Sequence, residues 1–106
     1  MPAKTSHQNH EGMTATLHIE DEITDYATWK QAFDRFADVR DKKGVTAHRV
    51  RLDEVNDRQI VIDLDFESTA RAHAFAAFLH DNVWGTVNSP ALVGTPATRV
   101  LIEAAR

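Results

Sequence analysis

The chain has 106 residues, of which 42% are hydrophobic and 26% charged, and its formal net charge is −4 at pH 7. This length suits one domain, and the composition is that of a globular protein rather than a disordered or fibrous one. The sequence contains no cysteine, which excludes disulfides and thiolate sites and favours a cytoplasmic location. No apolar run approaches the roughly 20 residues of a membrane span, and no basic block indicates nucleic-acid binding. We therefore expect neither a membrane nor a nucleic acid as a partner.

Residues 1–12 are almost without apolar side chains, which predicts a flexible N-terminal tail ahead of a domain at 13–106. His7 and His10 lie in this tail. Two imidazoles are too few for a defined metal site, which usually has three or four ligands. No metal is therefore expected.

The first strand and helix are indicated by a change of hydrophobic period. Apolar side chains alternate from Met13 to Ile19, which predicts a half-buried strand, and the acidic segment 21–24 predicts a turn. Asp25 is placed to cap a helix, and Gly44 to end it. Three- and four-residue spacing then predicts an apolar stripe of Tyr26, Trp29, Phe33, Phe36, Ala37 and the aliphatic stem of Arg40.

Segments 45–54 and 59–66 have the composition of two strands joined by turn residues around Asn56 and Asp57. A hairpin loop with an odd number of residues keeps one face apolar, whereas a two-residue loop would mix the faces. We therefore predict four pairs on the apolar face: Leu52 with Ile60, Val50 with Ile62, His48 with Leu64, and Thr46 with Phe66.

A second helix is predicted from a cap at Ser68 to about Asn82. Its buried stripe would consist of Ala72, Phe75, Phe78 and Leu79, with His73 and His80 on the solvated side. Segment 83–96 predicts a short helical turn and a loop, because it holds two glycines and two prolines. A last strand is expected at about 97–104.

The predicted order of strand, helix, strand, strand, helix, strand indicates one α+β domain. Right-handed crossovers would place both helices on one face of a four-stranded antiparallel sheet. The expected fold is therefore ferredoxin-like βαββαβ.

Several short motifs resemble one family of proteins of this fold. They are the helical pattern of Asp25, Tyr26, Trp29, Lys30, Phe33 and Phe36, the segment 44–50 (GVTAHRV), and the segment 93–96 (VGTP). Together they resemble the dimeric α/β-barrel superfamily, and within it small proteins similar to antibiotic biosynthesis monooxygenases. The resemblance covers about 13–106. It implies a homodimer formed through the sheets, a pocket between each sheet and its own helices, and activities that include cofactor-independent oxidation of phenolic polyketides.

The face of the sheet away from the helices bears on the expected homodimer. This face could be solvated, or it could pair with a second copy through arginine–carboxylate contacts. Its predicted side chains are polar and of mixed charge: Thr16, His18, Glu20, Arg49, Arg51, Asp63, Asp65, Arg99 and Glu103.

His48 is the ionisable residue that the predicted register places among apolar side chains. Desolvation there would favour the neutral imidazole that a general base requires, so His48 is the candidate catalytic residue. The alternative is a core histidine whose ring nitrogens are satisfied by neighbours. Aromatic residues at helical spacing are likewise either core or ligand platform. The candidate substrate-binding residues are Tyr26, Trp29, Phe33, Phe66, Phe75 and Trp84.

Two functions follow from these features. In the first, His48 removes a proton from a small aromatic or enolic substrate, and the anion reduces dioxygen without metal or cofactor. In the second, the same pocket holds a small apolar molecule without turnover, as a binding or stress-associated protein would. Haem breakdown is disfavoured because His73 and His80 are predicted to point outward. Serine-histidine-aspartate, phosphate-loop and zinc motifs are not found in the sequence.

Overall fold

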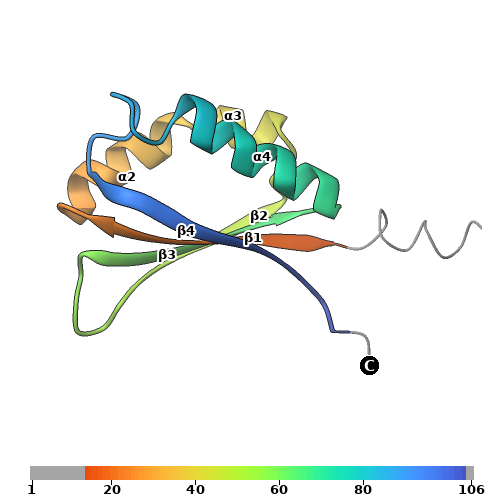
Figure 1. The fold of residues 1–106 in the computed structure, drawn as a ribbon, viewed down its shortest axis with the longest axis horizontal. Helices are drawn as coiled ribbons and strands as arrows, with labels where there is room; N and C mark the ends of the chain where they lie inside the picture. The colour runs from red at the N-terminus through yellow and green to blue at the C-terminus, as the bar shows by residue number, and fades with distance from the viewer. Residues whose placement is uncertain (1–13, 105–106) are drawn as a thin grey trace, which may run out of the picture.

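A computed structural model describes residues 14–104 and forms one antiparallel sheet with helices on one face (Figure 1). The strand order is β2-β3-β1-β4, which confirms the predicted ferredoxin-like fold. The predicted tail with His7 and His10, together with Met13 and residues 105–106, lies outside the described residues. The elements are β1 (Ala15–Ile23), α2 (Tyr26–Arg35), α3 (Ala37–Lys42), β2 (Ala47–Leu52), β3 (Gln59–Phe66), α4 (Thr69–Asn82) and β4 (Leu92–Ile102).

The hairpin of β2 and β3 has the predicted register. His48 pairs with Leu64, and Val50 with Ile62, which keeps the apolar side chains of both strands on the helix face. The predicted strand 45–54 was too long, because Asp53 begins the turn: its Oδ2 accepts hydrogen bonds from the backbone N–H of Val55 and of the next residue. The hairpin therefore confirms the odd-numbered loop.

The helical segment after β1 is capped as predicted but is not one helix. Asp25 Oδ1 accepts a hydrogen bond from the backbone N–H of Thr28 at 2.8 Å. The chain then leaves helical geometry at Phe36, which has φ −95° and ψ 12° and separates α2 from α3. Gly44 ends the segment with φ +98°, a left-handed conformation that glycine adopts at low cost. The prediction of a continuous helix was therefore wrong.

Helix α4 agrees with its predicted bounds. Ser68 Oγ accepts a hydrogen bond from the backbone N–H of Arg71, which is the predicted cap. Ala72 and Phe75 are buried, whereas His73 and His80 are exposed as predicted. The helix thus turns one apolar side toward the sheet.

The largest differences from the sequence prediction lie where β1 meets β4. The segment 21–24 does not turn, because β1 continues to Ile23, and β4 begins at Leu92 rather than near residue 97. The β1–β4 pairing shifts between Glu20, which pairs with Ala97, and Glu22, which pairs with Val93. Three residues of β4 therefore lie opposite Asp21 in a β-bulge. An edge strand such as β4 tolerates the irregularity that its Gly94 and Pro96 introduce.

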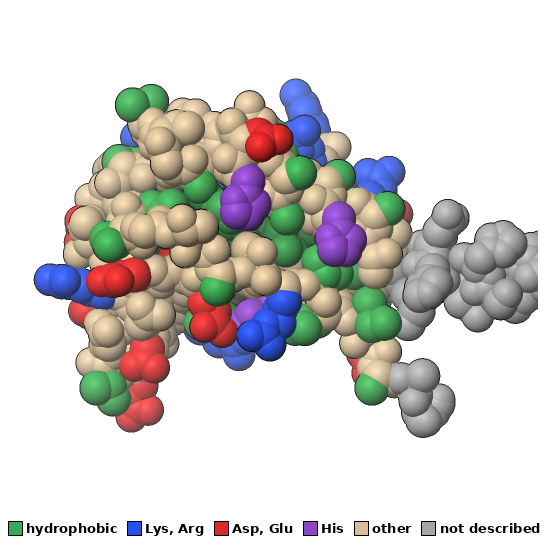
Figure 2. Space-filling model, viewed as in Figure 1, with side chains coloured by type: hydrophobic (Ala, Val, Ile, Leu, Met, Phe, Trp, Pro, Cys, Tyr) green, Lys and Arg blue, Asp and Glu red, His purple; other side chains and the backbone are tan. Residues whose placement is uncertain are grey.

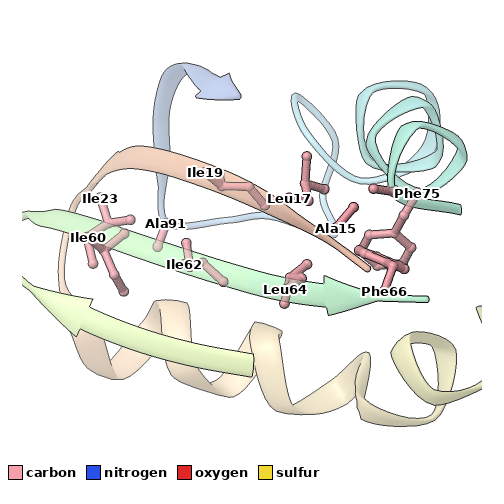
Figure 3. Packing of buried hydrophobic residues seen from close by; sticks show 11 residues of the cluster. Ala15, Leu17, Ile19, Ile23, Ile60, Ile62, Leu64, Phe66, Phe75 and Ala91 are labelled. Carbon is pink, nitrogen blue, oxygen red and sulfur yellow. The ribbon is translucent and has the colours of Figure 1, made fainter. Parts of the chain in front are cut away.

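The hydrophobic core lies between the sheet and the helices. Figure 3 shows Phe66 of β3 and Phe75 of α4 pointing toward one another, and their ring centroids are 5.6 Å apart. Leu17, Ile23 and Ile60 are also fully buried, with Ile23 and Ile60 at the other end of the same core (Figure 3). Within residues 14–104, no helix is long and apolar enough to cross a membrane.

Candidate functional site

A small apolar cavity lies between the sheet and the helices. Its volume is about 90 Å³, and its walls come from β1, β3, the three helices and the segment that connects α4 to β4. Figure 2 shows hydrophobic side chains, in green, in a hollow on the face that carries α4 and β4. The aromatic lining consists of Trp29, Phe33, Phe36, Phe75, Phe78 and Trp84.

Four of the six predicted substrate-binding residues line this cavity: Trp29, Phe33, Phe75 and Trp84. The other two do not. Tyr26 is exposed, and its ring stacks on Trp29 at 6.0 Å from outside the cavity lining. Phe66 has no exposed surface and belongs to the core, because β3 is a central strand covered by α4.

His48 is placed differently from its prediction. Its side chain does face the helices, and its ring lies edge-on to Phe33 with the centroids 5.4 Å apart. It is nevertheless exposed and is not part of the cavity lining. The predicted desolvation was wrong because β2 is the edge strand of the sheet, where the helices leave the inward face open to solvent. Catalysis by His48 stays a prediction that the geometry does not favour.

The acidic group of the cavity is Asp21, which the sequence analysis had placed in a turn. Asp21 is 4% exposed and lines the cavity. Its Oδ1 is buried without a hydrogen-bond partner among the described residues. Burial in this apolar setting raises the pKa of the Asp21 carboxyl to about 7. Asp21 can therefore take up or release a proton near neutral pH.

The alternation of β1 was the signal for this residue. Positions 15, 17 and 19 face the core, and the apolar Ile23 resumes the same parity after Asp21. A strand extended by four residues would have placed the carboxyl of Asp21 on the buried face.

Arg40 of α3 brings a positive charge to the same cavity. It is 8% exposed, and its guanidinium carbon lies 3.6 Å from the ring centroid of Phe33. Its Nη1 donates a hydrogen bond of 2.6 Å to the backbone carbonyl of Phe33, near the break between α2 and α3. Burial lowers the pKa of the guanidinium, and Asp34 partly offsets this effect. An arginine remains charged under these conditions.

The segment after α4 forms one wall of the cavity. The carbonyl of Val83 accepts hydrogen bonds from Thr86 Oγ1 at 2.7 Å and from Ser89 Oγ at 2.8 Å. The ring of Trp84 meets that of His80 edge-on, with the centroids 4.8 Å apart. These contacts fix Trp84 at the cavity.

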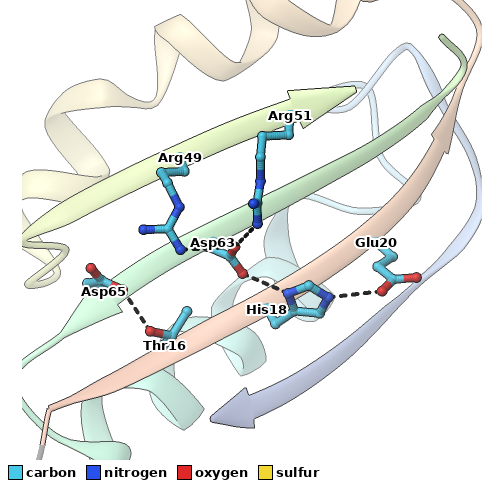
Figure 4. Close-up of polar contacts among 7 residues, drawn as sticks. All are labelled: Thr16, His18, Glu20, Arg49, Arg51, Asp63 and Asp65. Atoms are coloured by element: carbon cyan, nitrogen blue, oxygen red, sulfur yellow. Dashed lines mark hydrogen bonds and ion pairs between the residues drawn. The ribbon is translucent and has the colours of Figure 1, made fainter. Parts of the chain in front are cut away.

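The opposite face of the sheet carries a polar network, shown in Figure 4. Its centre is Asp63, whose side chain is 6% exposed. Asp63 Oδ1 is 2.7 Å from His18 Nδ1, and Asp63 Oδ2 accepts a hydrogen bond of 2.8 Å from Arg51 Nη2. Arg49 lies at 3.5 Å from the same oxygen. Glu20 Oε2 lies 2.9 Å from the other ring nitrogen of His18.

The two carboxylates favour a charged imidazole at His18. The hydrogen bond with Glu20 is the largest cause that raises the pKa of His18, and Asp63 adds to it against the effect of burial. The network is therefore a compensated set of opposite charges. Among residues 14–104, no three histidine, aspartate or glutamate side chains are grouped as metal ligands would be.

Comparisons with known proteins find the fold but no family at the level of sequence. No family model matches the chain, and no curated protein matches it. Solved structures do match. A candidate antibiotic biosynthesis monooxygenase from Bordetella bronchiseptica is 8% identical, with a TM-score of 0.69, over 88% of this chain and 99% of that one.

Two further structures are similar. SnoaB from Streptomyces nogalater, described as a cofactor-independent oxygenase, is 17% identical with a TM-score of 0.59, over 89% of this chain and 94% of that one. A dimeric ferredoxin-like protein from an uncultured marine organism is 11% identical with a TM-score of 0.58, over 89% and 98%. At these identities the likeness concerns the fold, and it confirms the predicted structural resemblance to antibiotic biosynthesis monooxygenases.

Proposed function

We propose that the chain binds a small apolar molecule with an enolic or phenolic group, and that Asp21 removes a proton from it. The observation that carries this proposal is a buried carboxyl group, unpartnered at Oδ1, in the wall of an aromatic cavity. A base with a pKa near the working pH combines a useful ionised fraction with a sufficient drive for proton transfer. The apolar walls exclude water from the anion that forms.

The proposed reaction continues with dioxygen, as in a cofactor-independent monooxygenase. The substrate anion supplies electrons to dioxygen. For a substrate with an activated methylene group, two hydrogens leave the carbon, one oxygen atom becomes its carbonyl oxygen, and the other oxygen atom leaves as water. Support for this step comes from the fold shared with SnoaB, which is described as such an oxygenase.

Proton abstraction is tested without knowledge of the natural substrate. The probe is 2-indanone, a small ketone whose activated methylene protons exchange for deuterium in D₂O, followed by proton NMR. We expect the protein to accelerate this exchange and Asp21→Asn to lower the rate by about 100-fold or more, which is the usual size of a general-base contribution. Glu22→Gln, a neighbour in β1 with an exposed side chain, is the matched control.

The same assay compares Asp21 with His48. If Asp21 is the base, His48→Ala keeps the exchange rate and Asp21→Asn loses it. The reverse result would return the catalytic role to His48 and contradict the proposal. Oxygen consumption, measured with an electrode on the same samples, reports the second step separately.

A second candidate function is binding without turnover. The cavity of about 90 Å³ is smaller than the roughly 300–1,000 Å³ of drug-sized ligand sites, which favours retention of a very small molecule over work on a polycyclic one. This function predicts that 2-indanone changes the fluorescence of the protein while its exchange rate stays at the level of buffer.

We also propose a homodimer formed through the open face of the sheet, in the cytoplasm. Support comes from a similar protein described as dimeric and from the exposed arginines Arg49 and Arg51, which can meet carboxylates of a second copy. Native mass spectrometry at micromolar concentration tests the assembly. A monomer there would contradict it, and a dimer with added mass would also give the mass of a bound ligand.

A further inference from the structure

We propose that the cavity is specific for small apolar molecules that carry one carboxylate, and that Arg40 holds this carboxylate. The inference deepens the proposed function, because it names the substrate class of the cavity that Asp21 lines. It rests on the position, burial and hydrogen bonding of Arg40 and on the shape of the cavity.

The guanidinium of Arg40 has one edge without a partner. Its hydrogen bond to the carbonyl of Phe33 uses Nη1. Among residues 14–104, no hydrogen bond from Nε or Nη2 is formed, and no carboxylate lies within ion-pair distance of Arg40. Those two nitrogens form the planar fork that matches the two oxygens of a carboxylate.

The structural contacts of Arg40 do not account for its charge. The hydrogen bond to the Phe33 carbonyl requires an N–H donor, and the contact with the Phe33 ring requires a flat group. Neither contact requires a positive charge. Burial of most of the side chain disfavours the cation and lowers the pKa of the guanidinium, while the free nitrogens of the fork keep some exposed surface that a ligand can reach. An anionic ligand in the cavity would supply the missing partner.

Arg40 and Asp21 reach the cavity from opposite layers of the fold. Arg40 comes from α3 and Asp21 from β1, so a ligand between them touches both. They do not form an ion pair with each other, and only burial accounts for the raised pKa of Asp21. A carboxylate bound at Arg40 would keep its apolar part among the aromatic rings, with its reactive carbon toward Asp21. The volume of the cavity, about 90 Å³, keeps this apolar part small.

The two tryptophans make the test direct. Trp29 and Trp84 are the only tryptophans of the chain, and both line the cavity. Titration with benzoate and with benzamide, a neutral molecule of nearly the same size, is followed by intrinsic fluorescence. We expect benzoate to bind at least about 10-fold more tightly, because a hydrogen bond to a charged group gains about 1.5–3 kcal/mol.

Variants of Arg40 then test whether this residue causes the preference for benzoate over benzamide. Arg40→Met should weaken benzoate binding by about 10- to 100-fold and leave benzamide binding within about twofold. Arg35→Met, at an exposed position of α2, is the matched control and should change neither. Arg40→Lys keeps the charge without the fork and should fall between wild type and Arg40→Met. If circular dichroism shows that Arg40→Met does not fold, the wild-type comparison and Arg40→Lys decide.

Several outcomes would overturn the inference. Equal affinity for benzoate and benzamide in the wild type would do so, as would absence of benzoate binding or unchanged benzoate binding in Arg40→Met. The exchange of 2-indanone reports on Asp21 alone. Exchange that depends on Asp21 without preference for benzoate would leave the proposed function standing and remove the carboxylate site. Preference for benzoate without exchange of 2-indanone would leave the carboxylate site standing and remove the proposed function.

Discussion

His18 Nδ1 lies 2.7 Å from Oδ1 of Asp63, and the second ring nitrogen of His18 lies 2.9 Å from Glu20. The imidazole thus bridges two carboxylates on the open face of the sheet. Arg51 and Arg49 contact Asp63 from β2, and Arg99 is the residue paired with His18 in β4. The charge of His18 therefore affects the stability of a network whose side-chain contacts join β1, β2 and β3.

The first prediction concerns this charge. The hydrogen bond with Glu20 raises the pKa of His18 in the folded protein above the usual 6.5. The stabilisation is fully present below the unfolded-state pKa and is lost as pH rises through the folded-state pKa. As the pH rises above 6.5, the free energy of unfolding measured in urea should therefore fall less for His18→Gln than for wild type. His73→Gln, on the exposed side of α4, is the control, and an identical pH profile for His18→Gln and wild type would contradict the prediction.

The second prediction concerns Asp21. The folded protein keeps the proton of this carboxyl up to about pH 7, whereas the unfolded chain releases it near pH 4. The free energy of unfolding should therefore fall as pH rises from about 4 to 7, by at most about 4 kcal/mol. Asp21→Asn removes this dependence. It should be more stable than wild type in urea at pH 8, while equal or lower stability at that pH would argue against a buried, unpaired carboxylate.

The third prediction concerns Phe66 and Tyr26, the two predicted substrate-binding residues that do not line the cavity. Phe66 is fully buried against Phe75, so Phe66→Ala should lose about 3–5 kcal/mol of unfolding free energy. Tyr26 is 39% exposed, and Tyr26→Ala should lose less than about 1 kcal/mol. Denaturant unfolding measures both. A small loss for Phe66→Ala would mean that the core between β3 and α4 is packed differently.

The fourth prediction concerns the glycine that follows the C-cap residue of α3. Gly44 has φ +98°, and a Cβ there would lie 2.9 Å from Nη1 of Arg71. Gly44→Ala should lose about 1–2 kcal/mol, because the left-handed conformation is strained for alanine. Gly44→Asn should lose less stability than Gly44→Ala, since asparagine tolerates the left-handed conformation. Thermal unfolding compares the two, and a neutral Gly44→Ala would show that the turn can relax.

Local pattern predicted the fold well where each side chain has one clear partner. The caps at Asp25 and Ser68 and the pairing of His48 with Leu64 follow from short-range geometry and strand parity. Three of the aromatic residues that line the cavity, Trp29, Phe33 and Phe75, were identified because helical spacing puts them on the apolar stripes of their helices.

The acid–base group was missed because its burial depends on distant segments. Asp21 is acidic and precedes a glutamate, which is typical of a turn, yet the sheet continues through it. His48 was given the correct strand face, but exposure also depends on whether a helix covers the sheet edge. Tertiary coverage of this kind is not encoded in alternation or helical spacing.

The β-bulge opposite Asp21 arises because β4 has more residues than β1 between two of their pairings. The pairings of Glu20 with Ala97 and of Glu22 with Val93 leave three residues of β4 against one of β1. A chain shorter by two residues between Val93 and Ala97 could keep one continuous ladder with every side chain on its present face. The irregularity beside the carboxyl would then arise or disappear in evolution by insertion and deletion. A two-residue insertion or deletion in β4 would therefore add or remove the bulge beside the carboxyl without moving any other side chain to the opposite face.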